Sequence, residues 1–427
     1  MINESSITLK MVYSACVVIK TPDVVVLCDP WFTDGIYDGS WFVFPSHEDP
    51  KSVIGDCDFV YISHIHPDHY DPAFLRSYFA EYGGKPFIIA DRSPNYLAMK
   101  LGQDFENAEV FTGQVTRGET EMKVYSHNTG SNSDIDSALE VAYRSSNKVH
   151  RVINLNDCVY DPDFLCEIKA EKNFDVCLTG YAGAGSYPQT YFSLDDPELK
   201  KAAELKKAKM FERYLNTTES IDASINIPFA GQYVLGGKFT KLNQHRGVAD
   251  ATEVLNLDRR SVVLEDYGGT ISTDDLSIRN GRLRAYSDSQ LEVRLNEIID
   301  RKMIYETDNA EPTEFKSIQN ALSISEINAR QKSECTRDYF FVFVFEDETN
   351  LAINANRNST GGVTEVVNAW DVGEPRSEIY IDRRYFYGLL TRQFHWNNAE
   401  VGSQYETRRF PNEFDRAAQR YLNFLAV

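Results

Sequence analysis

The segment 63–69, with the sequence SHIHPDH, constrains the fold of this chain more than any other feature of its sequence. It directly follows a short apolar run that is typical of a buried strand. In extended backbone, side chains two residues apart point the same way, so His64 and His66 can reach one metal ion together. The turn through the proline then presents Asp68 and His69 to the same point. The pattern therefore predicts a strand that ends at a metal-binding loop.

The residue types of this segment indicate which metals it would bind. Imidazole nitrogens and a carboxylate suit zinc, iron or manganese, and the lack of a thiolate argues against a purely structural zinc site. Loops at strand ends are also where α/β proteins place their chemistry. The alternative is a polar turn whose histidines cap a helix, but three histidines and an aspartate at this spacing favour the metal site. We expect one or two divalent metal ions, zinc or iron, with manganese as a third candidate.

Strand and helix candidates alternate over the first 255 residues. Short runs of valine, isoleucine and leucine are typical of buried strands, and longer stretches rich in lysine, glutamate, alanine and leucine favour helices. This alternation predicts an α/β fold. The strand candidates are 24–28, 58–63, 86–90, 138–143, 151–155 and 176–180, and the helix candidates are 71–82 and 195–216.

The pattern changes after about residue 256, and a chain of 427 residues is long enough for more than one structural unit. We expect a metal-binding domain over 1–255 and a smaller α+β unit over 256–427 that packs on it. The aromatic run 339–345 is too apolar to stand exposed, so it should lie inside this second unit. The elements expected there are a helix within 310–336, strands at 339–345, 350–354 and 378–381, and a closing helix at 411–425.

Charge and composition narrow the choice of partners and compartment. A net charge of −20 and a pI near 4.9 argue against a nucleic-acid groove, but a bound divalent metal would still allow an anionic substrate. No stretch approaches the roughly 18 apolar residues of a membrane span, and the N-terminus lacks the pattern of a signal peptide. The seven cysteines form no CxxC pair, so we expect no disulfide framework and a reducing, cytoplasmic environment. Nothing in the sequence indicates the oligomeric state.

The histidine cluster resembles the HxHxDH motif of the metallo-β-lactamase superfamily. This resemblance implies an αββα sandwich in which the first two histidines bind one metal, while Asp68 and His69 bind a second. It also implies that an aspartate after a later strand, here Asp157, bridges the two metals. Asp29 resembles the family's aspartate that orients a metal ligand by a hydrogen bond. Outside this family pattern, Asp157 and Asp29 would be ordinary turn residues.

Further stretches are similar to CMP-N-acetylneuraminate hydroxylase and its bacterial relatives, and to UlaG-like proteins. That hydroxylase carries a Rieske iron–sulfur domain, which needs paired Cys-x-His and Cys-x-x-His ligands. No such pairs occur in residues 1–427, so we expect no electron-transfer cluster in this chain. The stretches that carry the resemblance are 28–31, 61–69, 156–158, 180–184 with 187–188, 227–231 and 395–400.

Two histidines of the family's metal site have no direct match. The third-strand histidine would fall near Ser131, and the last would fall near Phe229 or Ala230, where no ligand is present. His127 or His245 could substitute from nearby, although each also fits an ordinary surface or hydrogen-bonded histidine.

One more histidine, His395, lies beside Trp396 and could sit at the pocket mouth or pack at the interface between the two units. The glycine-containing stretches 180–185 and 231–237 could line the pocket, although ordinary turns account for them equally well.

Three functions follow as alternatives. The first is a metallohydrolase, in which a metal-activated water attacks an anionic small molecule such as a nucleotide, a phosphoester or a sugar derivative. Asp68 and Asp157 would be its catalytic residues, because either could orient that water. The second is a non-haem iron oxygenase that takes electrons from a separate redox partner. The third is a non-catalytic protein that keeps the fold and binds a ligand or a protein partner.

Overall fold

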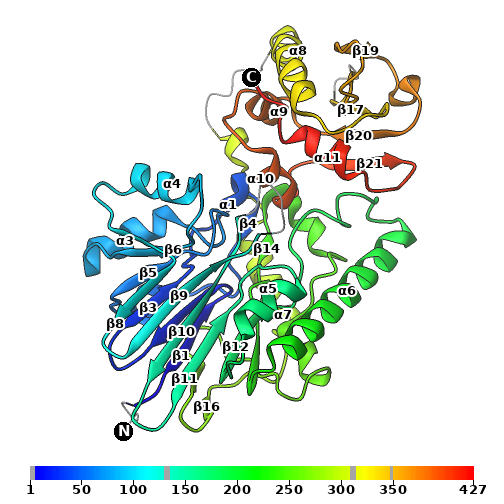
Figure 1. Ribbon diagram of the computed structural model, residues 1–427. Helices are drawn as coiled ribbons and strands as arrows, with labels where there is room; N and C mark the ends of the chain where they lie inside the picture. The colour runs from blue at the N-terminus through cyan, green and yellow to red at the C-terminus, as the bar shows by residue number, and fades with distance from the viewer. Residues whose placement is uncertain (1–4, 129–134, 308–313, 347–349) are drawn as a thin grey trace.

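The computed structural model describes residues 5–128, 135–307, 314–346 and 350–427. Two β-sheets face each other through a shared core, and helices cover the outer face of each sheet (Figure 1). A separate five-stranded sheet with its own helices lies over one end of this sandwich. The expected α/β sandwich with a smaller C-terminal unit is thus confirmed.

The strands of the first sheet are β1 (Thr8–Tyr13), β2 (Cys16–Lys20), β3 (Val25–Cys28), β5 (Phe59–Tyr61), β6 (Phe87–Ile89), β7 (Val110–Thr112), β15 (Thr270–Ser272) and β16 (Ile278–Arg279). Their order across the sheet is β16-β15-β1-β2-β3-β5-β6-β7. Neighbours are antiparallel as far as β3 and parallel from β3 to β7. β15 and β16 follow residue 255 yet extend this sheet beside β1, so the sheet runs past the expected domain boundary.

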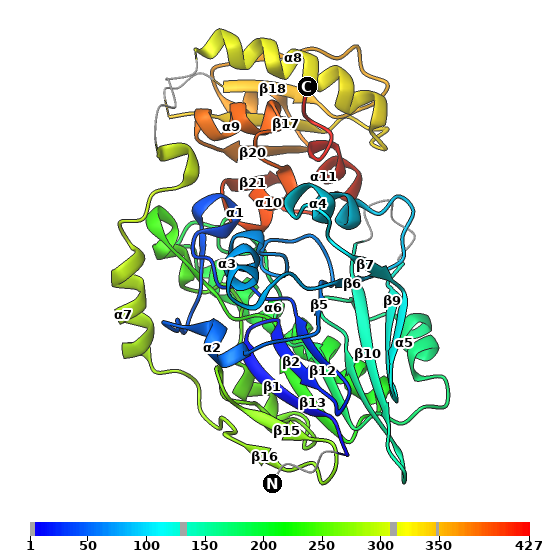
Figure 2. The ribbon, with the colours of Figure 1, turned by 90° about the vertical axis from the view of Figure 1, so that its left-hand side faces the viewer.

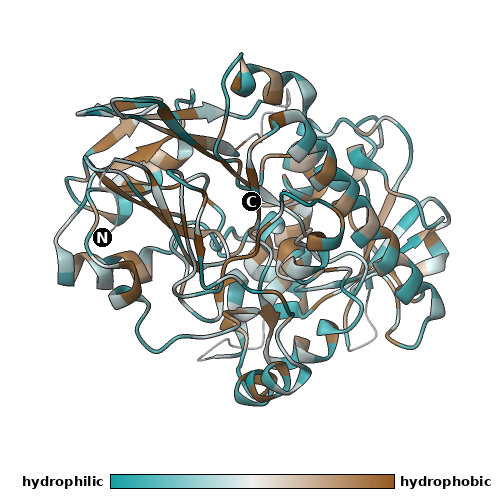
Figure 3. Ribbon diagram, turned by 90° about the horizontal axis from the view of Figure 1, so that it is seen from below, coloured by the Kyte–Doolittle hydropathy of each residue, from teal (hydrophilic) through white to brown (hydrophobic). Residues whose placement is uncertain are grey.

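The strands of the second sheet are β8 (Gln114–Arg117), β9 (Thr120–Ser126), β10 (Ser137–Arg144), β11 (Val149–Asn154), β12 (Val176–Gly180) and β13 (Ile225–Phe229). Their order is β13-β12-β11-β10-β9-β8, and β11, β12 and β13 run parallel. Alternate side chains such as Val17, Val26 and Val141 point between the two sheets, as the two-residue period of a strand requires. The strands of the sandwich are largely hydrophobic in Figure 3.

The helices that cover the sandwich are α2 (Pro50–Ile54), α3 (Pro72–Tyr82) and α4 (Tyr96–Asp104) on the first sheet, and α5 (Pro162–Lys169) and α6 (Pro197–Ile221) on the second. Each begins after an Asp or Asn whose side chain accepts a hydrogen bond from the first turn. α6 continues five residues beyond its expected end at 216, because Thr217, Thr218 and Ile221 are buried. Tertiary packing thus outweighs the weak helix propensity of threonine.

The C-terminal unit consists of the strands β17 (Phe340–Val344), β18 (Asn350–Asn354), β19 (Thr364–Val366), β20 (Arg376–Tyr380) and β21 (Glu406–Phe410) with the helices α8 (Phe315–Lys332), α9 (Arg383–Leu390) and α11 (Arg416–Leu422). Its sheet order is β19-β18-β17-β20-β21. Phe341, Phe343 and Phe345 are buried in its core, as expected for the aromatic run. The closing helix begins only at Arg416, because Asp415 caps it.

The C-terminal unit also contains η4 (Ala369–Val372) and α10 (Trp396–Val401), whose buried residues belong to its core. The connecting elements are α1 (Ile36–Gly39), β4 (Trp41–Phe42), β14 (Val234–Leu235), η1 (Gly237–Asn243), η2 (Ala251–Asn256), α7 (Asp288–Ile298) and η3 (Ile304–Glu306). α1 and α10 lie where the C-terminal unit meets the sandwich, far from the N-terminus (Figure 2). All seven cysteines are free thiols. Within the described residues, no helix combines the length and apolar character needed to cross a membrane.

Candidate metal centre

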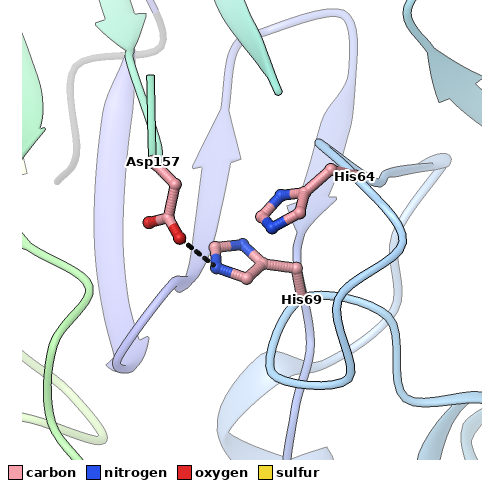
Figure 4. A group of neighbouring side chains, drawn as sticks. All are labelled: His64, His69 and Asp157. Carbon is pink, nitrogen blue, oxygen red and sulfur yellow. Dashed lines mark ion pairs between the residues drawn. The ribbon is translucent and has the colours of Figure 1, made fainter. Parts of the chain in front are cut away.

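Three potential metal ligands come together where strands of the two sheets end. His64 and His69 lie on the loop after β5 of the first sheet, and Asp157 follows β11 of the second. One ligand atom from each lies within 4.8 Å of the other two (Figure 4). His69 Nε2 is 3.5 Å from Asp157 Oδ2, and both histidines are buried. The sandwich therefore brings residues some 90 positions apart into one group capable of holding a metal ion.

The other two residues of the motif flank this group. His66 Nδ1 is 2.8 Å from His64 Nε2, and Asp68 Oδ2 is 3.6 Å from His69 Nε2. The hydroxyl of Tyr37 donates a hydrogen bond to Asp68 Oδ1 at 2.5 Å. All four motif residues thus surround one small volume, although His66 and Asp68 lie outside the tight three-residue group.

Asp29 lies behind His69, at the end of β3. Its Oδ1 accepts a hydrogen bond from the backbone N–H of Ser63 at 2.7 Å, and its Oδ2 is 3.3 Å from His69 Nδ1. The side chain is completely buried, and its backbone adopts a left-handed conformation with φ of 41°. Such strain in a non-glycine residue is typical of functional sites. Asp29 holds one ring nitrogen of His69 and leaves Nε2 facing Asp157, which is how an outer carboxylate orients a metal-binding histidine.

The protonation states of the cluster are set by burial and by neighbouring charges. Burial lowers the pKa of His64 well below its ordinary value, so its imidazole is neutral and available to a metal. Burial alone would also lower the pKa of His69, but the carboxylates of Asp157 and Asp68 raise it well above the ordinary value. Burial would raise the pKa of Asp157, but the nearby His69 holds it well below the ordinary value. The carboxylates therefore attract positive charge to His69, where a divalent cation can take the place of the proton.

His69 Nε2 tests whether these residues fit a metal. This atom is buried, and among the described residues it has no hydrogen-bond partner. An unsatisfied buried polar atom costs on the order of 1–3 kcal/mol. A cation held by His64, His69 and Asp157 would satisfy Nε2 and neutralise the carboxylate. The residues present therefore fit a divalent metal ion.

The two substitute ligands considered from the sequence lie outside the group. His127 is buried, but its ring packs on Phe164 and its Nε2 is 3.6 Å from Asp161 Oδ2. His245 is exposed. Ser131, where the family's third-strand histidine would fall, lies outside the described residues.

Two residues near the cluster had not been named as site residues from the sequence, although one of them, Asn397, lies in the stretch 395–400 that carried the resemblance. Asp136 Oδ1 is 3.9 Å from His64 Nδ1, and burial together with the charge of Asp157 raises the pKa of this carboxyl group. Its only sequence signal is its position, five residues beyond Ser131. Asn397 Oδ1 is 2.8 Å from His66 Nε2 and comes from α10 of the C-terminal unit. His395, two residues earlier, instead caps α10 by accepting the N–H of Asn397.

A cavity of about 340 Å³ opens beside the cluster, a size that suits a small molecule. Close packing of glycines shapes it: a Cβ on Gly231 would lie 2.9 Å from Ala182 Cβ, and one on Gly183 would lie 3.1 Å from Met210 Sδ. The cavity is lined by Ser14, Trp41, Asp68, Asp157, Gly180, Ala182, Gly183, Ala184, Lys206, Met210, Arg213, Ala230, Gly231 and Tyr233.

Two cations of α6 lie on the wall of this cavity. Lys206 Nζ donates to the Tyr187 carbonyl at 2.8 Å, and Arg213 Nη2 donates to the Cys158 carbonyl at 2.7 Å. Among the described residues, no carboxylate lies within ion-pair distance of either cation. Burial, together with the charge of Arg246, lowers the pKa of Lys206 to about 7. In a chain with a net charge of −20, two such cations beside a cavity favour an anionic ligand.

Part of the chain that carries these residues matches the model of a known protein family. Residues 8–210 match the family model of the beta-lactamase superfamily domain. This stretch contains the first sheet up to β7, most of the second sheet, the histidine cluster and Asp157. The part of the chain that carries the candidate metal centre is therefore similar to the beta-lactamase superfamily domain.

Individual relatives cover similar parts of the chain. A Mycolicibacterium smegmatis protein named "Putative Rieske 2Fe-2S iron-sulfur protein" is 29% identical over 227 residues, which are 48% of this chain and 40% of that protein. Cytidine monophosphate-N-acetylneuraminic acid hydroxylase of Danio rerio is 25% identical over 236 residues, 53% of this chain and 38% of that enzyme. The chain thus spans about two fifths of the length of these relatives. Among solved structures, the metallo hydrolase Igni18 of Ignicoccus hospitalis matches 62% of this chain and 98% of its own, with 14% identity and a TM-score of 0.41.

Proposed function

We propose that the protein is a metal-dependent hydrolase that uses a metal-activated water on an anionic small molecule, such as a nucleotide, a phosphoester or a sugar derivative. The observation that carries this proposal is a His–His–Asp group, with both histidines buried, beside a cavity lined by two cations without carboxylate partners among the described residues. The superfamily match supports a metal at this group.

In this proposal the ligands divide as the superfamily pattern implies. His64 and His66 would hold one ion, Asp68 and His69 would hold a second, and Asp157 would contribute its carboxylate to the same site. A bound divalent metal supplies Lewis acidity and lowers the pKa of a coordinated water towards about 7. Asp29 keeps His69 oriented through Nδ1.

The residues around the cavity would handle the substrate. Lys206 and Arg213 bind its anionic group and place the scissile centre beside Asp68 and Asp157. Either aspartate can then accept a hydrogen bond from the attacking water and direct its lone pair. Trp41 also lines the cavity and has a buried indole N–H without a partner among the described residues. This N–H can donate to an acceptor on the substrate.

A second candidate function, a non-haem iron oxygenase, is supported by the similarity to the Danio rerio hydroxylase. Residues 1–427 contain no Rieske ligand pairs, so this function would need electrons from a separate partner. The same histidines and carboxylates suit iron as well as zinc. Elemental analysis of the purified protein separates the two: zinc with turnover of phosphoesters, esters or lactones supports the hydrolase, and iron with oxygen consumption supports the oxygenase.

The doubly substituted protein His64→Ala with His66→Ala should lose most of its bound metal. Both imidazoles are replaced by methyl groups, so one ion loses two nitrogen ligands. Metal content per chain is measured by elemental analysis, alongside hydrolysis of a panel of phosphoesters and lactones. His47→Ala is the control, because this histidine is exposed and its ring stacks on Tyr267 rather than on a residue of the cluster. Undiminished metal in the double variant would contradict the proposed function.

A further inference from the structure

The C-terminal unit reaches the metal-ligand cluster through the side chain of Asn397. Its Oδ1 lies 2.8 Å from His66 Nε2, although 331 positions separate the two residues. Asn397 is in the first turn of α10, and the neighbouring Trp396 anchors that turn: its ring is buried and its Nε1 donates to the Leu425 carbonyl at 2.9 Å. The amide is therefore presented from a rigid element.

This contact determines which nitrogen of His66 faces the cluster. An amide oxygen only accepts hydrogen bonds, so His66 Nε2 must carry the proton that it donates to Asn397. The lone pair then resides on Nδ1, which lies 2.8 Å from His64 Nε2 on the side of the proposed metal. A ring free to rotate would present either nitrogen in several orientations, which weakens metal binding.

A second connection from the same unit reaches Asp68. Gln404 Nε2 donates to the Tyr37 carbonyl at 2.7 Å, and the Tyr37 hydroxyl donates to Asp68 Oδ1 at 2.5 Å. Tyr37 is buried and has a left-handed backbone with φ of 51°, which is uncommon for an aromatic residue. The two motif residues outside the tight group, His66 and Asp68, are thus both held from the C-terminal unit.

We infer that the C-terminal unit completes the metal site, with Asn397 as the positioning residue that selects the metal-binding tautomer of His66. This inference rests on the proposed metal site but extends beyond the superfamily domain, whose match ends at residue 210. It predicts that a residue with no contact to substrate controls the affinity for the metal.

The test measures zinc affinity by competition with a chromophoric chelator, using zinc alone and no substrate. Asn397→Leu keeps the size of the side chain and removes the acceptor, so it should weaken zinc binding by about 10–100-fold, as is typical for loss of an outer-shell partner. Asn397→Asp keeps an acceptor and should retain at least the original affinity. Asn398→Leu is the matched control on the same helix.

Equal zinc affinity in Asn397→Leu and Asn398→Leu would overturn this inference. The melting temperature of the metal-free proteins checks that each variant folds. If Asn397→Leu does not fold, Asn397→Ala removes the acceptor with a smaller side chain. The visible spectrum of the cobalt-loaded protein gives a second readout, because altered His66 geometry changes it. If the unsubstituted protein failed to bind zinc, iron or manganese, the proposed function itself would be contradicted. If it bound zinc and substitution of Asn397 left the zinc affinity unchanged, only this inference would be contradicted.

Discussion

Asp157 joins the two sheets at the candidate metal centre. It follows a parallel strand of the second sheet, yet its carboxylate faces the histidines of the first. Its backbone carbonyl also accepts a hydrogen bond from Arg213 at 3.2 Å. Asp157 is therefore held by Arg213 at its backbone and by His69 at its side chain. A carboxylate can use two oxygens to hold two cations about 3.5–4 Å apart, which a neutral amide does poorly.

We therefore expect Asp157→Asn to keep the fold and lose metal. Its zinc affinity should fall by more than the roughly 10–100-fold typical of an outer-shell change, and turnover should fall far more than substrate binding. Metal stoichiometry and melting temperature are measured on the same sample, with the exposed Asp163→Asn as control. Normal stability combined with a full complement of metal would identify Asp157 as a turn residue.

At the scale of a single element, α6 links the surface of the sandwich to the cavity. Lys206, Met210 and Arg213 are spaced four and three residues apart, so they lie on one face of the helix, and all three line the cavity. Lys209 of the same helix is exposed and does not line the cavity. One helix face thus supplies the cationic wall, and the charge on Lys206 depends on pH near neutrality.

This predicts a pH dependence of anion binding. The pKa of Lys206 is lowered to about 7 by burial, so its side chain is charged below that pH and neutral above it. Affinity for pyrophosphate should therefore decrease as pH rises through about 7, beyond any decrease seen in Lys206→Met. Calorimetric titrations of the metal-loaded proteins at several pH values give this difference, and Lys209→Met serves as control. A parallel pH profile in Lys206→Met and the unsubstituted protein would rule out Lys206 as an anion-binding residue.

At the scale of the whole molecule, the C-terminal unit and the sandwich share an interface built from polar and aromatic residues. The Tyr385 hydroxyl donates to Asp38 at 2.6 Å, and Thr407 and Arg408 contact the carbonyl of Thr190. Gly39 packs so closely that a Cβ would lie 2.9 Å from Met303 Cα. The unit is therefore fitted to the sandwich at the same end as the candidate metal centre.

A chain that ends at residue 330 should be insoluble or unstable. It keeps most of α8 but loses the sheet on which this helix packs, which exposes Ile318, Leu322 and Ala329. The soluble fraction and the melting temperature of this truncated chain are compared with those of the full chain. If residues 1–330 were as stable and as metal-binding as the full chain, both the interdependence of the units and the role of Asn397 would be contradicted.

Local sequence patterns by themselves determined much of this protein. The apolar run before His64 becomes β5, and the predicted α3 begins and ends within one residue of its expected bounds, because Asp71 caps its first turn and glycine follows its last. The histidine cluster was predictable because its four candidate ligands, His64, His66, Asp68 and His69, lie within six consecutive residues of one loop. Such features depend on neighbouring residues only, so no knowledge of the tertiary structure is needed to see them.

Tertiary structure alone decided which distant residues join the cluster. Asp136 and Lys206 sit in polar contexts shared by many surface residues, and the stretch that contains Asn397 does not show which metal ligand it reaches. Only the packing of two sheets places Asp136 beside His64, and only the docking of α10 places Asn397 on His66. The physical reason is the sequence separation of the residues in contact. Helix caps and strand periodicity depend on residues a few positions apart, whereas the metal site and its cavity form from contacts between residues up to hundreds of positions apart, which no local pattern records.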